Sequence, residues 1–304
     1  MSFELILPFF RPIEHLLLCD TVSEIMVNPD SSVWIEEDGQ KTFLSRIRFE
    51  QGALEAGLEV IANRFGKKLD ADSPIMNIRL PDGSRLAAII PPVVNPRPLL
   101  TIRKFTARKL KMEDLVARKF IEADAAKTLQ EAVCRGDNIL ISGGTGTGKT
   151  TLANILANSI PDDDRILIIE DTAELAIRKP HVVSAEAQLD THKSAITFDD
   201  LLKAILRHRP DRIIVGEVRG SEARTLVDAL NTGHRGMLAT IHASSTVRAL
   251  HRLANLAIRG QANQSQSIVE ADIKNCIDFV VHLRWEKGRR YVHEVLVAAE
   301  STTS

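Results

Sequence analysis

One glycine-rich segment has the composition and spacing of a phosphate-binding loop. Gly143–Thr150 reads G-G-T-G-T-G-K-T and matches the pattern G-x-x-x-x-G-K-[ST]. Glycines let successive backbone N–H groups turn toward phosphate oxygens, and the start of a following helix adds positive potential. Lys149 is expected to reach the β- and γ-phosphates, and the Thr150 hydroxyl to bind Mg²⁺. The segment predicts binding of ATP with Mg²⁺ through Gly143, Gly144, Thr145, Gly146, Thr147, Gly148, Lys149, Thr150 and Thr151.

Two glutamates follow short aliphatic runs that read as buried strands. Glu217 follows Arg212–Val215, and Glu170 follows Arg165–Ile169. Ligand sites of α/β sheets form at the carboxyl ends of the strands. We assign to Glu217, on a strand expected to neighbour that of the loop, the polarisation of the attacking water. Glu170 joins it in the predicted Mg²⁺ site, with both acids acting through water. The alternatives are a surface glutamate and, for residues 170–172, a helix cap.

Two histidines and several arginines complete the candidate site. His234 and His242 bracket the predicted strand Met237–Ile241, and His242 at its carboxyl end is placed to sense a γ-phosphate through a hydrogen bond. Arginines stabilise the charge that develops in phosphoryl transfer. Ordinary surface or hydrogen-bonded side chains remain the alternative for Arg219 beside Glu217. The same alternative holds for three arginines of the first third of the chain, Arg79, Arg85 and Arg103.

The first third of the chain reads as a small α+β domain. A short helix is expected over His15–Met26, and helical periodicity runs through Gln51–Leu69. Asp38-Gly39 and Pro81-Asp82-Gly83 have the residue types of hairpin turns. A short strand is expected over Leu99–Arg103.

From Met112 onward, aliphatic runs alternate with helical segments. Alternation of this kind predicts a mostly parallel sheet with helices on both faces. Two last runs, Phe279–Leu283 and Tyr291–Val297, are expected to form an antiparallel hairpin at the sheet edge. The predicted organisation is an N-terminal α+β domain over 1–103, a basic linker over 104–111 and an α/β domain over 112–304.

Composition excludes several classes of protein. The 304 residues carry 39 Lys and Arg against 40 Asp and Glu, so no net charge draws the chain to nucleic acid or anionic lipid. The three scattered cysteines support neither a zinc ribbon nor a disulfide framework. No apolar run approaches the roughly 18 residues of a membrane span. These features predict a soluble protein whose membrane contact is peripheral or through a partner.

Taken in order, four segments resemble the motifs of the secretion traffic ATPases. They are Gly143–Thr150 (Walker A), Ile169–Thr172 (Asp box), Arg209–Arg219 (Walker B) and Gly233–Ala243 (His box). Glu24–Asp30 looks most like the TrbB-type conjugal-transfer branch. The resemblance runs from about residue 16 to residue 297.

The resemblance implies a homo-hexameric ring of RecA-like P-loop domains, each preceded by a PAS-like domain. Such rings hydrolyse ATP to power type IV secretion or conjugal transfer, through substrate translocation, pilus biogenesis or both. It implies inner-membrane components of the machine as partners and a cytoplasmic location at the inner face of the membrane. It also favours a role for His234 and His242, and phosphate contacts by Arg103, Arg85 and Arg79. Which arginines act across a subunit interface, and which acid is nearest Mg²⁺, stay open.

Three other functions share the phosphate-binding loop. A RecA-like nucleic-acid translocase or helicase would need a basic stripe and stacking aromatics. Near-neutral charge with one tyrosine and two tryptophans disfavours it, and no sequence-specific nucleic-acid binding is expected. Pilus assembly or retraction ATPases are disfavoured because the chain lacks a four-cysteine zinc module and a longer helical tail. A nucleotide-dependent switch would bind ATP but scarcely hydrolyse it.

Overall fold

A computed structural model describes residues 7–37, 39–50, 52–80, 82–104, 110–171, 173–187, 196–259 and 265–298. The chain divides into two compact units, Met1–Arg108 and Lys109–Ser304. Most of the predicted linker (105–109) lies outside the described residues, as do Asp38, Gln51, Pro81 and Thr172. The predicted boundary at 104–111 therefore stays a prediction.

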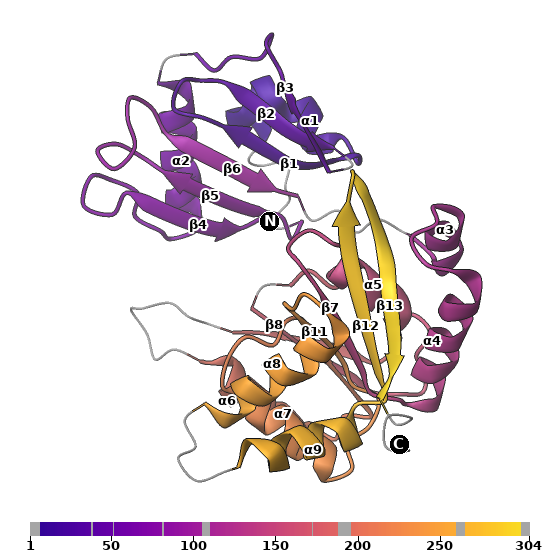
Figure 1. Cartoon of the computed structure of the whole chain (residues 1–304). Helices are drawn as coiled ribbons and strands as arrows, with labels where there is room; N and C mark the ends of the chain where they lie inside the picture. Colours follow the sequence, from indigo (N-terminus) through magenta and orange to yellow (C-terminus); the bar gives the residue numbers. More distant parts are fainter. Residues whose placement is uncertain are drawn as a thin grey trace. The chain divides into compact units, whose positions relative to one another are not determined.

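The first unit is built on an antiparallel sheet with helices against it (Figure 1). Over its described residues the sheet has six strands in the order β3-β2-β1-β6-β5-β4. Both predicted hairpins are present, as β2–β3 and β4–β5. The elements are a 3-10 helix at Leu7–Ile13, α1 (Glu14–Leu18), β1 (Val22–Val27), β2 (Val33–Glu37), β3 (Gln40–Phe43), α2 (Ala53–Arg64), β4 (Ile75–Arg79), β5 (Arg85–Ile89) and β6 (Leu99–Arg103).

One face of this sheet is buried and the other is not. Leu100 and Ile102 of β6 are fully buried in a core that includes Leu58 and Ile61 of α2. Thr101 and Arg103 alternate with them and lie on the opposite face. The same alternation recurs in β4 and β5. Antiparallel sheets with one solvated face show this period of two.

The predicted helix over His15–Met26 is wrong in its second half. The helix α1 ends at Leu18, and Val22–Val27 forms β1 in the middle of the sheet, paired with β2 and β6. Val22, Ile25 and Val27 of this strand are buried. β-Branched residues fit a pleated surface, and pairing on both sides outweighs local helical preference.

The second unit is a mixed sheet enclosed by helices (Figure 1). Its described part has seven strands in the order β13-β12-β7-β11-β10-β8-β9, parallel throughout except for the β12–β13 pair. The predicted edge hairpin is therefore confirmed. The strands are β7 (Ile139–Gly143), β8 (Ile166–Glu170), β9 (Val182–Glu186), β10 (Arg212–Val215), β11 (Leu238–Ile241), β12 (Phe279–Glu286) and β13 (Arg289–Val297).

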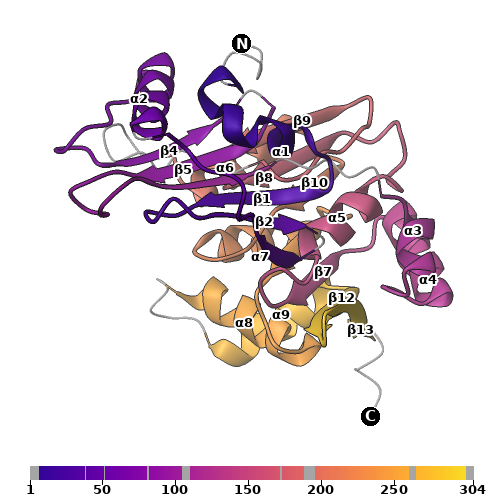
Figure 2. The same cartoon turned by 90° about the horizontal axis from the view of Figure 1, so that it is seen from above.

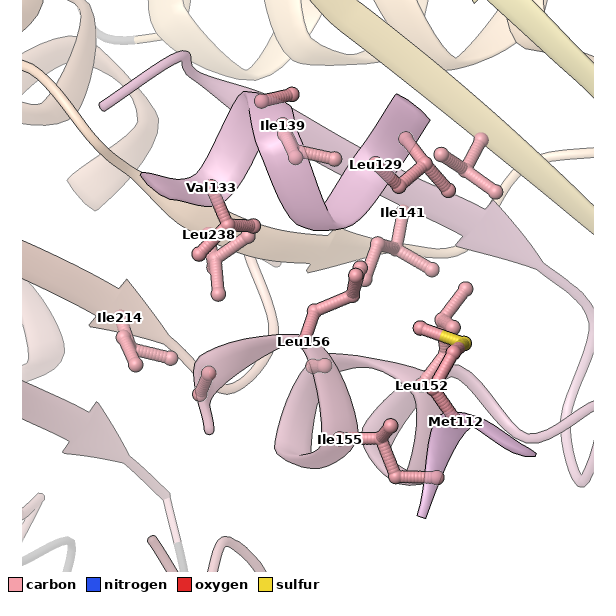
Figure 3. Close-up of a cluster of buried hydrophobic side chains, with 14 of the residues drawn as sticks. Met112, Leu129, Val133, Ile139, Ile141, Leu152, Ile155, Leu156, Ile214 and Leu238 are labelled. Carbon is pink, nitrogen blue, oxygen red and sulfur yellow. The ribbon is translucent and has the colours of Figure 1, made fainter. Parts of the chain in front are cut away.

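Helices pack on both faces of this sheet. Along β7, Ile139 and Ile141 face one core while Leu140 faces the other. Figure 3 shows the first core, where α4 and α5 cover residues such as Ile141 and Leu238. Full burial of one aliphatic side chain contributes about 1.5–3 kcal/mol. The helices are α3 (Met112–Ala117), α4 (Ala123–Arg135), α5 (Lys149–Ala157), α6 (Phe198–Ile205) followed by a 3-10 turn (Leu206–His208), α7 (Glu222–Asn231), α8 (Thr246–Ile258) and α9 (Gln266–Cys276).

Three expectations for this unit need correction. The strand β10 does not neighbour β7, because β11 lies between them. The strand β9, parallel to β8, was not predicted because none of its residues is fully buried and it lacks a long aliphatic run. The helix α9 was not predicted either. It packs against α8 through Val269 and Ile273, which are too few apolar positions to mark a helix in the sequence.

Candidate active site

The phosphate-binding loop joins β7 to α5, as its sequence requires. Residues 144–148 turn between the buried end of the strand and the first helical residue, Lys149. Gly148 has φ +99°, a conformation that only glycine adopts without strain. A Cβ at Gly143 would lie 2.7 Å from Thr147 Oγ1 and 2.8 Å from Leu283 O, so the loop is closely packed at its base.

The lysine of the loop is drawn inward. Lys149 is only 7% exposed, and its Nζ donates to the carbonyls of Gly143 (3.1 Å) and Gly144 (2.9 Å). Its Nζ also lies 3.5 Å from His242 Nε2. Burial lowers the pKa of Lys149, and Arg219 lowers it further, while Glu217 opposes the shift. The ammonium group is therefore held beside the loop backbone and close to acidic partners.

At the carboxyl ends of β8 and β10, Arg219 forms hydrogen bonds with two carboxylates, those of Glu217 and Asp171. Arg219 donates to both oxygens of Glu217, from Nε to Oε1 at 2.7 Å and from Nη2 to Oε2 at 2.9 Å. Its Nη1 donates to Asp171 Oδ2 at 2.7 Å. The side chain of Glu222 accepts from the backbone N–H of Arg219 and so fixes its position. Bidentate geometry of this kind is strong and directional.

His242 connects this cluster to the loop. Its Nε2 lies 3.3 Å from Glu217 Oε1. Burial lowers the pKa of His242, and the charge of Lys149 lowers it further. Burial would raise the pKa of Glu217, but the hydrogen bond from Arg219 and the nearby positive charges bring it below its usual range. Glu217 is therefore a carboxylate at neutral pH, next to a neutral imidazole.

Two acids at and after the end of β8, Glu170 and Glu174, differ in what they contact. Glu170 is 1% exposed, and its Oε1 accepts from the backbone N–H groups of Glu174 (2.8 Å) and Leu175 (2.9 Å). Its Oε2 has no hydrogen-bond partner among the described residues, and burial raises its pKa to about 7. Glu174, by contrast, accepts from the Thr150 hydroxyl at 3.2 Å. The described geometry thus presents Glu174, and not Glu170, to the loop threonine.

Two aromatic rings pack on the phosphate-binding loop. Phe120 lies against Gly148, and Trp285 of β12 lies against Gly146, each 3.3 Å from the position of an added Cβ. Trp285 is 44% exposed, and the Arg290 guanidinium lies 4.8 Å from the centre of its ring. The fluorescence of Trp285 is therefore expected to respond to changes at the loop.

The structure brings most of the predicted site together but not His234. The loop residues, Glu217, Arg219, Glu170 and His242 all lie at the carboxyl ends of the strands. His234 precedes β11, whereas His242 follows it, so the four-residue strand separates them by more than about 13 Å. A role of His234 at its own phosphate-binding loop therefore has no geometric support.

The three arginines of the first unit lie in one row. Arg79 of β4 pairs with Arg85 of β5, which pairs with Arg103 of β6. Paired positions on neighbouring strands point to the same side, here the face that α2 does not cover. Arg103 also lies 3.8 Å from Glu24 of β1. The fold thus gathers on one surface three positive charges that come from three successive strands.

Sequence reasoning did not find Glu174, Glu222 or Trp285. Glu174 lies in an irregular segment, where periodicity carries no information. Glu222 shows only the pattern of an acid in the first turn of a helix, which interacts favourably with helix N–H groups. Trp285 could have been found only from strand pairing: it lies two residues beyond Leu283, which pairs with Gly143 of β7. That signal requires the register of β12 on β7.

A strand–glycine loop–helix unit, with acids and a histidine at the carboxyl ends of other parallel strands of the same sheet, defines a P-loop nucleoside-triphosphatase fold of the RecA-like class. Residues 10–286 match the family model "Type II/IV secretion system protein". The chain belongs to this family.

Similar proteins are found among both sequences and solved structures. The chain is 39% identical to the conjugal transfer protein TrbB of Rhizobium radiobacter over 91% of this chain and 83% of that protein. It is 29% identical to the type IV secretion system protein VirB11 of Bartonella henselae over 96% and 92%. The DotB ATPase of Legionella pneumophila matches in structure with a TM-score of 0.65 at 20% identity, covering 96% of this chain and 81% of DotB. None of the helices in the described ranges is long and apolar enough to cross a bilayer.

Proposed function

We propose that this chain is an ATPase that powers a type IV secretion or conjugal-transfer machine. One observation carries the proposal: three predicted site residues meet at one edge of the sheet. His242 Nε2 lies 3.5 Å from Nζ of the loop residue Lys149 and 3.3 Å from Glu217 Oε1. This edge is where α/β proteins bind their ligands. Family membership and the similarity to TrbB and VirB11 support the same function.

In the proposed mechanism, the loop N–H groups and Lys149 hold the β- and γ-phosphates. Glu217, ionised and held on both oxygens by Arg219, accepts a hydrogen bond from the attacking water and aims it at the γ-phosphorus. Because its pKa lies below the usual range, Glu217 is a weak base that orients the water before it takes up a proton. His242, neutral at pH 7, is placed to donate or accept beside the terminal phosphate.

The oxygens beside the loop fit a magnesium ion. The Thr150 hydroxyl and Glu174 Oε2 lie 3.2 Å apart, and Mg²⁺ prefers one or two such oxygens together with substrate phosphates. When bound, Mg²⁺ neutralises charge on the phosphate oxygens. Thr150 would contact it directly, and Glu174 and Glu217 through water. Glu170, predicted to join the Mg²⁺ site through water, acts in this proposal by holding the backbone of Glu174 in place.

The remaining parts of the proposal rest on the family and on the arginine row. We propose that Arg79, Arg85 and Arg103 supply positive charge to the phosphates, that the first unit is PAS-like, and that the chain works as a homo-hexamer. Inner-membrane components of the machine are the proposed partners, at the cytoplasmic face of the membrane.

Two variants and a control test the proposed activity. Lys149→Ala is expected to abolish ATP binding, which can be followed by the fluorescence of Trp285. Glu217→Gln is expected to keep ATP bound but to reduce phosphate release by about 100-fold or more, the scale of losing a positioned catalytic group. Glu131→Gln, on the exposed surface of α4, is the control and should match the parent.

The outcomes separate the alternatives. Turnover at the parental rate by Glu217→Gln would refute the role of that residue. ATP binding without turnover in the parent chain, in the presence of Mg²⁺, would point to a nucleotide-dependent switch instead.

A further inference from the structure

A pocket of about 480 Å³ opens beside the candidate active site, within the second unit. His242 contributes to its wall, together with Ser244 of the following turn. Ala243 also lines it, and the remaining residues lie on one face of α8 and at its C-cap: Arg248, His251, Arg252, Asn255, Leu256 and Arg259. The helix α8 lies beside α9 near the β12–β13 hairpin (Figure 2).

The helical period separates the two faces of α8. Arg248, Arg252 and Arg259 are exposed and spaced by four and seven residues, which places them on one side of the helix. Residues between them, such as Leu253 and Ala257, are fully buried against the sheet. The core therefore fixes the rotation of α8, and with it the direction of the three arginines.

Nearby carboxylates are already engaged by other groups. Glu270 of α9 accepts from Gln266 and contacts His251. Glu294 of β13 accepts from the Thr246 hydroxyl. In the part of the chain that the structure describes, no carboxylate pairs with the guanidinium groups of the three pocket arginines. The pocket is therefore positively charged.

The pocket and the active site share His242. Its Nε2 lies 3.3 Å from Glu217 Oε1 and 3.5 Å from Lys149 Nζ, while the residue also lines the pocket. The charge of Arg252 acts on the His242 ring. An anion that leaves the terminal-phosphate position past His242 would thus meet the arginines next.

We propose that this arginine-lined pocket binds inorganic phosphate, the product of the proposed hydrolysis, on its way out of the active site. This inference rests on the proposed function. Guanidinium groups bind phosphate oxygens in a bidentate manner. The lining contains no Phe, Tyr or Trp, the large aromatic side chains on which successive bases stack, and this disfavours single-stranded nucleic acid. Charge-assisted hydrogen bonds from each arginine are expected to strengthen phosphate binding about tenfold.

Phosphate binding is measured first without turnover. In full-length protein carrying Lys149→Ala, which disables the loop, inorganic phosphate is titrated and followed by ³¹P line broadening at constant ionic strength. Binding is expected to persist in this background. Adding Arg248→Gln and Arg252→Gln should weaken it by about 100-fold, the product of the two single effects. Glutamine keeps helix propensity, so the exposed face of α8 should fold as before.

A matched control and a second measurement keep the proposal falsifiable. Arg235→Gln, at an exposed position before β11, removes one positive charge outside the pocket and should leave phosphate binding unchanged. In the chain with an intact loop, added phosphate should inhibit ATP turnover, and the paired arginine variant should need at least tenfold more phosphate for the same inhibition.

Three results would overturn the proposal: no phosphate binding in the Lys149→Ala chain, unchanged binding in the paired variant, or an equal loss with Arg235→Gln. The titration does not require hydrolysis. A chain that bound phosphate through these arginines but never hydrolysed ATP would refute the proposed function alone.

Discussion

The two sheets of this chain solve different burial problems. In the first unit, strands alternate between a core face and an open face, and the open face carries Arg79, Arg85 and Arg103 in register. In the second unit both faces are buried, so β7 has adjacent fully buried residues in Leu140 and Ile141. A one-sided sheet has room to display charge along its strands. The buried central strands of a two-sided sheet place charge only where they end, whereas its edge strand β13 also carries charge along its length.

That difference explains where the candidate chemistry lies. Glu217, Glu170 and His242 all stand at or just beyond strand ends of the second unit, where backbone groups and loops can hold them. Burial there changes their protonation, as the raised pKa of Glu170 shows. The arginines of the first unit lie mostly on an exposed strand surface, where charge costs little desolvation.

The largest expected change in the free energy of unfolding comes from truncating buried side chains, on both faces of β7 and on the core face of β6. Leu140→Ala and Ile141→Ala should each lower the free energy of unfolding by about 2–5 kcal/mol, because both side chains are fully buried. In β6, Ile102→Ala should cost a similar amount, whereas Thr101→Ala on the open face should stay within about 0.5 kcal/mol. Urea unfolding checks this, with Trp34 reporting on the first unit and Trp285 on the second.

The contrast between a one-sided and a two-sided sheet would be contradicted by either of two results. Thr101→Ala could prove as destabilising as Ile102→Ala, or Leu140→Ala or Ile141→Ala could leave the free energy of unfolding unchanged.

A smaller effect is expected from the buried carboxyl of Glu170. Its pKa is raised from 4.5 to about 7, so the folded state binds the proton more tightly than the unfolded state. Its contribution to stability is full below about pH 4.5 and is lost as the pH rises through about 7. Glu170→Gln, a neutral residue that can accept the same N–H groups, should remove about 1–3 kcal/mol of this pH dependence.

The measurement is urea unfolding of the Trp285 transition between pH 5 and pH 8. The Trp34 transition of the first unit, which does not contain Glu170, is the internal control. A pH profile unchanged by Glu170→Gln would show that this carboxyl is not held neutral by burial.

The smallest effect is expected from the arginine row. Arg85→Gln, in the middle of the row, should lower ATP turnover by about tenfold, since one cationic contact to a phosphate is worth about that factor. Its free energy of unfolding should change by less than about 0.5 kcal/mol, because Arg85 is not buried and lies on the open face of the sheet. Steady-state turnover and urea unfolding measure the two quantities.

Lys41→Gln on the exposed strand β3 is the matched control and should alter neither quantity. Parental turnover in Arg85→Gln would remove the case for a catalytic contribution of the row.

Sequence reasoning succeeded where a local signal was strong. The glycine-rich turn with its preceding strand β7 and following helix α5, and both hairpins, were predicted because spacing, turn residues and aliphatic runs determine them locally. It failed for residues 22–27, where pairing with two neighbouring strands decided the conformation. It also failed for β9 and α9, whose apolar positions are too few to show a period.

The sequence by itself determined the turn from β7 into α5, because Gly146 and Gly148 allow the positive φ angles that the turn requires. The sequence also predicted that Glu170 and Glu217 lie at strand ends, because each of them follows an aliphatic run. Only the tertiary structure decided which acid faces Thr150, that His234 and His242 lie at opposite ends of β11, and that the register of β4, β5 and β6 aligns three arginines in one row. These relations depend on strand order and register, which arise from packing between segments far apart in the chain.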